Sequence, residues 1–205
     1  MILSTNFVAE RERSECVAWR RFPRGEQIFI FYGARPNCEL LVHNGFVPAH
    51  NEHDSIALRL GVSRADPLFE RRCALLVRLA LPAAGEFTLR AGADPVDSSL
   101  RAFLRVFSMN AEQLEDWLDR EDCSELELEQ CQVDSDVETR AWTFLAARVR
   151  LLLQAYPSTL EEDELLLTSR GISSCRRLAV QQRVAEKTLL RSTLDFTQQQ
   201  LSSAQ

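Results

Sequence analysis

The spacing of hydrophobic and polar residues changes at about residue 61, and the two parts of the chain predict different structures. In the first part, short β-branched and aromatic runs alternate with turn residues such as Pro23 and Gly25, which is typical of strands joined by turns. A small helix is expected after Pro36, ended by Asn44-Gly45. Strands are expected at Glu15–Trp19, at Gln27–Tyr32 as a buried strand, and at Ser55–Leu60.

From Ala65 onward the spacing is helical. One continuous apolar face is formed by Leu100, Phe103, Leu104 and Phe107. Ser or Asn followed three residues later by Glu or Gln predicts capped helix starts, here at Asn110, Ser135 and Ser158. Helices are expected over 66–81, 98–109, from 110 through 118, over 135–156, from 158 onward and over 173–199, with a long acidic loop at 120–136. The whole pattern predicts an α+β protein that is mainly α.

Composition excludes several functional classes. The net charge of −6 argues against binding to nucleic-acid phosphates, which favours a basic surface. No apolar run approaches the roughly 18 to 20 residues of a membrane span. The first nine residues lack the basic leader of a secretory signal, so the six cysteines are expected to be free thiols. His50 and His53 have no partner ligands at a recognisable spacing, so no metal site is expected.

Two motifs in the first part form a recognisable pattern: Tyr32-Gly-x-Arg35-x-Asn37-x-Glu39, and then His43-x-Gly45-Phe46. This pattern resembles the C-terminal end of a SET domain, in the actin-histidine N-methyltransferase branch of the SET-domain protein methyltransferases. The helical part resembles the Rubisco large-subunit methyltransferase substrate-binding domain, through Leu60–Arg64, Ala102–Phe107 and Thr159–Asp163. The resemblance implies three segments: an incomplete SET part at 1–61, a helical substrate-binding domain at 62–195 and a polar tail at 196–205.

By this resemblance the chain belongs to an enzyme that transfers a methyl group from S-adenosylmethionine to a histidine of actin. Tyr32 is then the catalytic residue, whose hydroxyl orders the reacting groups, and Arg35 holds the substrate peptide. Asn44, Gly45 and Phe46 then line the S-adenosylmethionine pocket, although Asn44 stands where the family has serine. Because a histidine with its ordinary pKa near 6.5 is mostly neutral at pH 7, such a site has to orient the acceptor more than deprotonate it.

Each of these residues also has a purely structural interpretation. Tyr32 could pack at a strand end, Arg35 could be a solvated turn residue, and Asn44-Gly45-Phe46 could be an ordinary helix end. His43 is interpreted as a structural helix residue.

The resemblance also implies elements that the first 14 residues do not supply. These are a glycine-rich cofactor loop, an Asn-His motif and an asparagine that orients the acceptor imidazole. The chain alone is therefore expected to be inactive. Two alternatives remain open: a non-catalytic module that binds actin or another partner, and part of a related protein-lysine methyltransferase. A cytoplasmic location, extending to the nucleus, is expected.

Overall fold

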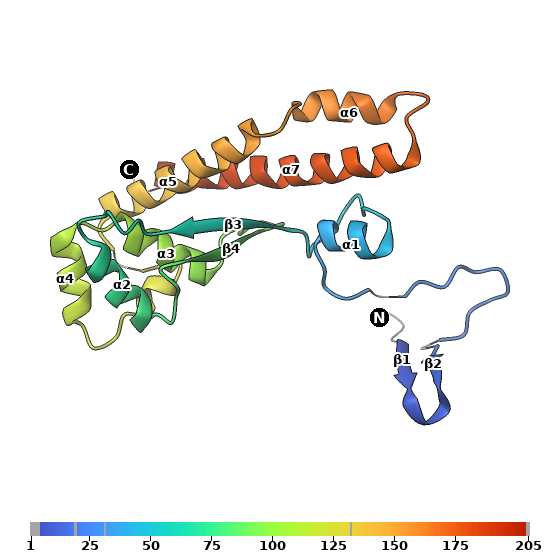
Figure 1. The fold of residues 1–205 in the computed structure, drawn as a ribbon, viewed down its shortest axis with the longest axis horizontal. Helices are drawn as coiled ribbons and strands as arrows, with labels where there is room; N and C mark the ends of the chain where they lie inside the picture. The colour runs from blue at the N-terminus through green and yellow to red at the C-terminus, as the bar shows by residue number, and fades with distance from the viewer. Residues whose placement is uncertain (1–4, 19, 31, 132, 204–205) are drawn as a thin grey trace. The chain divides into compact units, whose positions relative to one another are not determined.

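The computed structural model describes residues 5–18, 20–30, 32–131 and 133–203 (Figure 1). The chain divides into two compact units, residues 1–35 and 36–205. The fold is mainly helical with two small sheets, so the predicted α+β class with a helical majority is confirmed.

The first unit contains one antiparallel hairpin. Strand β1 (Thr5–Val8) pairs with β2 (Arg13–Cys16), with Val8 opposite Arg13. The short 3-10 helix η1 (Ala9–Arg11) and Glu12, which adopts a left-handed conformation, connect the two strands. The strand expected at Glu15–Trp19 thus lies further N-terminal, and Trp19 is outside the described residues.

The prediction of a buried strand at Gln27–Tyr32 is wrong. Apart from an isolated bridge at Ile30, the described residues of this segment form no strand, and Phe31 is outside the described residues. Ile28 is 52% exposed and Phe29 is 70% exposed. A run of β-branched and aromatic residues indicates side chains suited to a strand, but a stable strand also needs neighbouring strands and an apolar cover.

The second unit begins with helix α1 (Asn37–Asn44), as predicted. Pro36 precedes the helix, where its missing N–H costs nothing. Gly45 ends it with φ of 75°, and its N–H donates to the Leu41 carbonyl at 3.1 Å. Glycine reaches this left-handed conformation without the steric cost that a Cβ would add.

Strand β3 (Ser55–Gly61) is close to the predicted strand and pairs antiparallel with β4 (Ala84–Arg90). Strand β4 was missed, because the sequence after Ala65 reads as helical throughout. Helix α2 (Phe69–Arg78) connects the two strands and is shorter than the helix expected at 66–81. Gly61 lies opposite Ala84, and a Cβ added there would come within 2.8 Å of the Ala84 Cβ, so the close pairing of the strand ends requires glycine.

The helices after β4 cover the sheet and build the core. Helix α3 (Ser98–Ser108) is buried along most of its length, and its Phe103 ring lies 4.6 Å from the Phe87 ring of β4, centroid to centroid. Helix α5 (Ser135–Gln154) and helix α7 (Ser174–Ser203) lie side by side, and α6 (Leu160–Thr168) packs on the first half of α7 (Figure 1). Helix α4 (Ala111–Asp119) contacts α2.

The predicted helix starts were confirmed to different degrees. Asn110 and Gln113 form the expected capping box of α4. The box on α6 is formed by Thr159 and Glu162, one residue later than expected. The box expected at Ser135 is wrong, because Asp134 precedes α5 without a side-chain cap and Glu138 has another partner.

That partner is Arg105, a buried guanidinium that holds three parts of the fold together. Its Nε donates to the Glu138 carboxylate of α5 at 2.6 Å, and its Nη1 donates to the carbonyls of Leu126 and Leu128 at 2.7 and 2.6 Å. The acidic connection after α4, which contains the 3-10 helix η2 (Ser124–Glu127), is therefore fixed to α3 rather than being a free loop. Removing one partner of a buried ion pair typically costs about 3 to 5 kcal/mol of stability.

We predict that limited proteolysis cuts the chain between residues 17 and 35 and leaves a resistant fragment that begins near Pro36. Most of the described residues of that segment are exposed, and none of them forms a helix or strand, whereas β3 pairs with β4 along its whole length. Mass spectrometry of the fragment identifies its first residue. A resistant fragment that begins between Gly61 and Ala65, as the change of pattern in the sequence suggests, would contradict this prediction, because it would lack β3.

Candidate functional site

The sequence-predicted site residues fall in both units, and each group is described by itself. Tyr32 and Arg35 belong to the first unit, where both are exposed and lie outside helices and strands. Gly33 between them has φ of 92°, and a Cβ added there would lie 3.6 Å from the Arg35 Nε. The Arg35 side chain thus folds back along its own turn. The roles assigned to these two residues stay predictions.

Asn44, Gly45 and Phe46 form the C-terminal end of α1 in the second unit. Asn44 is exposed, Gly45 turns the chain, and Phe46 is half-buried. His43 is exposed in the last turn of the helix. The last carbonyl groups of a helix lack intrahelical partners and carry a partial negative charge, so this end can attract a cationic group.

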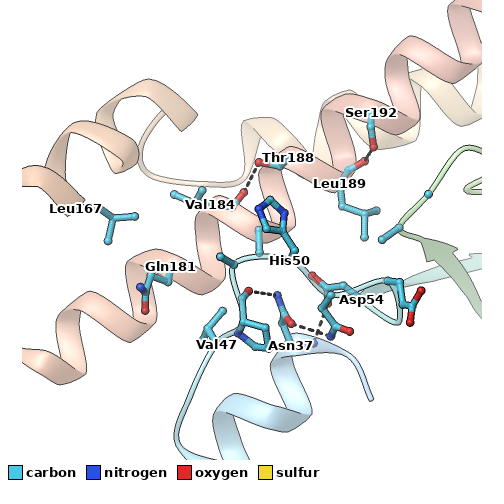
Figure 2. Close-up of a pocket in the computed structure, with 17 residues that line it drawn as sticks. Asn37, Val47, His50, Asp54, Leu167, Gln181, Val184, Thr188, Leu189 and Ser192 are labelled. Atoms are coloured by element: carbon cyan, nitrogen blue, oxygen red, sulfur yellow. Dashed lines mark hydrogen bonds between the residues drawn. The ribbon is translucent and has the colours of Figure 1, made fainter. Parts of the chain in front are cut away.

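Sequence reasoning missed the group that fixes this segment, the carboxylate of Asp54. Its Oδ1 accepts the backbone N–H of Asn37 at 2.8 Å (Figure 2). The same oxygen accepts the backbone N–H of Ser55 at 3.0 Å. The Asp54 carbonyl also accepts the N–H of Ala91 at 2.8 Å. One residue therefore joins the start of α1, the start of β3 and the end of β4.

The side chain of Asn37 completes this joint. Asn51 Nδ2 donates to Asn37 Oδ1 at 2.9 Å, and Asn37 Nδ2 donates to the Pro48 carbonyl at 3.4 Å. Asn37 is 2% exposed and is the first residue of α1, so it is an internal polar anchor in the first turn of the helix. The sequence shows an Asn after Pro36 and an Asp before a predicted strand. It does not show that these two residues, 17 positions apart, form a hydrogen bond.

The Asp54 carboxyl group lies in an unusual electrostatic environment. Burial raises its pKa, the N–H donors of Asn37 and Ser55 oppose that change, and the charge of Glu186 on α7 raises the pKa further. Helix α7 itself packs against α1.

We also searched the described residues for a metal site and for a membrane-spanning helix. No cluster of three or more His, Cys, Asp or Glu side chains in the described ranges is placed to hold a metal ion. Within the same residues, no helix combines the length and the apolar composition needed to cross a membrane. All six cysteines are free thiols, and Cys123 is buried.

Comparison with known proteins places these features in a family. A family model described as Rubisco LSMT substrate-binding matches residues 63–190. The chain is 38% identical over 193 residues to the actin-histidine N-methyltransferase of Gallus gallus, covering 92% of this chain and 32% of that protein. The corresponding proteins of Canis lupus familiaris and Homo sapiens are 39% and 37% identical, with 92% of this chain and 33% and 32% of those proteins covered.

The chain thus spans about a third of the length of the curated relatives it matches. A solved structure of Rubisco LSMT bound to AdoMet has a TM-score of 0.75 and 23% identity, and the match covers 88% of this chain and 42% of that chain. At that identity the structural match supports the fold alone. The resemblance seen in the sequence is confirmed by these matches, and the chain belongs to the Rubisco LSMT substrate-binding family.

Proposed function

We propose that this chain is part of an S-adenosylmethionine-dependent protein-histidine N-methyltransferase that acts on actin. The observation that carries the proposal is the identity of 37–39% to proteins named actin-histidine N-methyltransferase, which covers 92% of the chain. A match of this extent includes the tyrosine-arginine motif as well as the helical domain. Actin as substrate is compatible with a cytoplasmic and nuclear location.

The proposed division is a SET part at residues 1–61, a substrate-binding domain at 62–195 and a polar tail. The family match at residues 63–190 supports the bounds of the proposed substrate-binding domain. Strand β3 of the proposed SET part pairs with β4 of the proposed substrate-binding domain, so the two parts belong to one folded unit from Pro36 onward. The Asp54 joint then has a function, because it ties the proposed cofactor segment to the helical domain.

In this proposal each residue has a distinct task. S-adenosylmethionine supplies an electrophilic methyl group on a positively charged sulfur. The C-terminal end of α1, with Asn44, Gly45 and Phe46, fits a group of this kind because it combines a half-buried aromatic ring with helix carbonyls that favour a cation. Tyr32 orders the acceptor with its hydroxyl group, and the planar guanidinium of Arg35 holds carbonyl or carboxylate groups of the peptide.

The histidine acceptor is favoured over lysine by the relatives, whereas the likeness to a lysine-bound LSMT rests on 23% identity and supports the fold alone. The physical difference between the acceptors is large. Deprotonating a lysine with its ordinary pKa near 10.4 costs about 4.6 kcal/mol at pH 7, and a histidine needs no such step. A site that works through orientation is thus sufficient for histidine.

A segment exchange tests the proposal. The matched 193 residues of this chain replace the corresponding segment of the Gallus gallus relative, and transfer of a labelled methyl group to an actin peptide is measured. Methylation is expected on the peptide with histidine and not on the same peptide with alanine. The 205-residue chain, tested in parallel, is expected to give no transfer. Preferred transfer to a lysine peptide, or a folded hybrid that binds cofactor but transfers no methyl group, would reject the proposal.

Tyr32→Phe in the hybrid is expected to lower kcat by about 10- to 150-fold, because it removes one hydrogen bond that is strongest in the transition state. KM should change little, since the ring remains. Steady-state kinetics separate the two effects. Tyr156→Phe is the matched control: its hydroxyl donates to Glu186 at 2.6 Å in the helical domain, so its loss should lower stability and leave kcat unchanged. Equal kcat values for Tyr32→Phe and the parent would show that Tyr32 only packs.

Arg35→Ala is expected to raise KM for the actin peptide with a smaller change of kcat, because its contacts are made to the bound peptide before methyl transfer. Arg35→Lys should recover only part of the affinity, since an ammonium group cannot replace a planar fork of donors. Arg24→Ala, an exposed arginine of the same unit, serves as the control. A purely kcat effect at Arg35 would contradict the substrate-binding role.

A further inference from the structure

A cleft of about 600 Å³ lies entirely within the second unit. It is bounded by residues 47–54, by the turn after β4 and by one side of α7, and Leu167 at the end of α6 also lines it (Figure 2). The proposed cofactor segment 44–46 of the same unit does not line it. Its volume falls in the range of typical ligand pockets.

The walls of this cleft are largely aliphatic. Val184, Ala185 and Leu189 contribute from successive turns of α7, and Val47 and Ala49 contribute from the segment after α1. Leu189 is 5% exposed, so it forms the floor, while Val184 and Ala185 are half-buried. Such a surface suits a hydrocarbon chain of a few methylene groups more than a compact polar ligand.

The charges on the rim have one sign. Among the described residues that line the cleft, the carboxyl side chains are Glu52 and Asp54, and no lysine or arginine is present. The Glu52 side chain is 88% exposed and can move to a ligand, whereas Asp54 is held in the wall. Glu186 of α7 does not line the cleft, and its carboxylate accepts from the Tyr156 hydroxyl at 2.6 Å and from Gln182 Nε2 at 2.9 Å.

The nearby cations are already engaged elsewhere. Lys187 Nζ lies 2.6 Å from the Asp163 carboxylate, and Arg183 pairs with the same carboxylate at 2.5 Å. Arg177 donates to the Leu167 carbonyl at 2.7 Å. Of the rim carboxylates, Asp54 accepts two backbone N–H groups through Oδ1, and Glu52 lies 3.7 Å from the His53 Nε2 in an exposed pair that a ligand cation can replace. A ligand suited to this rim should therefore combine a cationic end with an aliphatic stem.

We propose that this cleft is a docking site for a basic peptide segment of a partner protein, with one lysine or arginine side chain inserted. The stem of that side chain lies along Val184 and Leu189, and its charged end lies near Glu52 and Asp54. Lysine and arginine carry long apolar stems below their charge, which is the combination that these walls and this rim select. The volume leaves room for an apolar residue next to the basic one.

The test uses the complete 205-residue chain and labelled peptides, with binding followed by fluorescence anisotropy. The probe is Ala-Leu-Lys-Leu-Ala, and the matched probe has glutamine in place of lysine. Binding of the lysine peptide with a dissociation constant below 1 mM, at least ten-fold tighter than the glutamine peptide, is expected. It should weaken with added salt. No binding at 1 mM, or equal binding of both peptides, would overturn the proposal.

Variants locate the binding. Glu52→Gln should weaken binding about two- to five-fold, as expected for one exposed charge pair. Thr188→Lys, at an exposed position in the cleft wall, should weaken it more than ten-fold by repulsion and occupancy. Glu86→Gln on β4 is the control, because it removes an exposed carboxylate that does not line the cleft. Melting curves identify any variant that is unfolded.

Two results would count against a peptide at this place. If Glu52→Gln and Thr188→Lys both fold and bind like the parent, the binding site is elsewhere. If N-acetyl-lysine amide binds as tightly as the pentapeptide, the cleft takes free amines and the peptide part of the proposal is wrong. The measurement involves no methyl transfer, so its failure leaves the proposed function unaffected.

Discussion

The carboxylate of Asp54 is the constraint on which the arrangement of the second unit depends. The carboxylate accepts the backbone N–H groups of Asn37 and Ser55, and the backbone carbonyl of Asp54 accepts the N–H of Ala91. Hydrogen bonds to a charged group contribute about 1.5 to 3 kcal/mol each, and a buried donor that loses its acceptor costs a similar amount. The residue is 8% exposed, so water cannot readily replace it. The position of α1, and with it the proposed cofactor segment, follows from this joint.

Buried cations fix the helices to one another in a similar way. Arg105 joins α3, α5 and the connection around η2, and Arg72 donates to the Met109 carbonyl at 3.0 Å while pairing with Asp66 at 3.0 Å. Lys187 of α7 donates to the Ser158 carbonyl at 2.6 Å and pairs with Asp163 of α6. Each cation satisfies carbonyl groups that no regular helix or strand bond would satisfy. Lys187 therefore fixes α7 to α6 and to the turn that precedes α6.

The helices could be predicted from the sequence because their signals are local. The apolar face of Ser98–Ser108 and the box of Asn110 with Gln113 each lie within a few residues of one another. The box expected at Ser135 failed because Glu138 is bound by Arg105, 33 residues away in the sequence. Strand β4 was missed for a related reason: its alternation of Phe87 and Leu89 is short, and only pairing with β3 makes it a strand.

The parts of the candidate site that come from one contiguous motif could be predicted from the sequence. The parts that folding assembles from distant segments could not. Asn44, Gly45 and Phe46 end a helix as expected, whereas the expected strand before Tyr32 is absent from the described residues of 27–32. The Asn37–Asp54 joint and the cleft beside α7 depend on contacts between distant segments, so no local pattern indicates them.

Hydrogen exchange of the Asp54→Ala variant tests the central claim most directly. The backbone amides of Leu40 to Gly45 are expected to exchange about 10- to 100-fold faster than in the parent chain, because α1 loses its anchor. The amides in the middle of α5 and α7 should keep their protection. Asp122→Ala, which removes a carboxylate that accepts the Ser124 N–H at 2.8 Å in an exposed loop, should leave α1 unchanged. Unchanged exchange in α1 of Asp54→Ala, or an equal acceleration throughout the unit, would contradict the claim that Asp54 holds this helix.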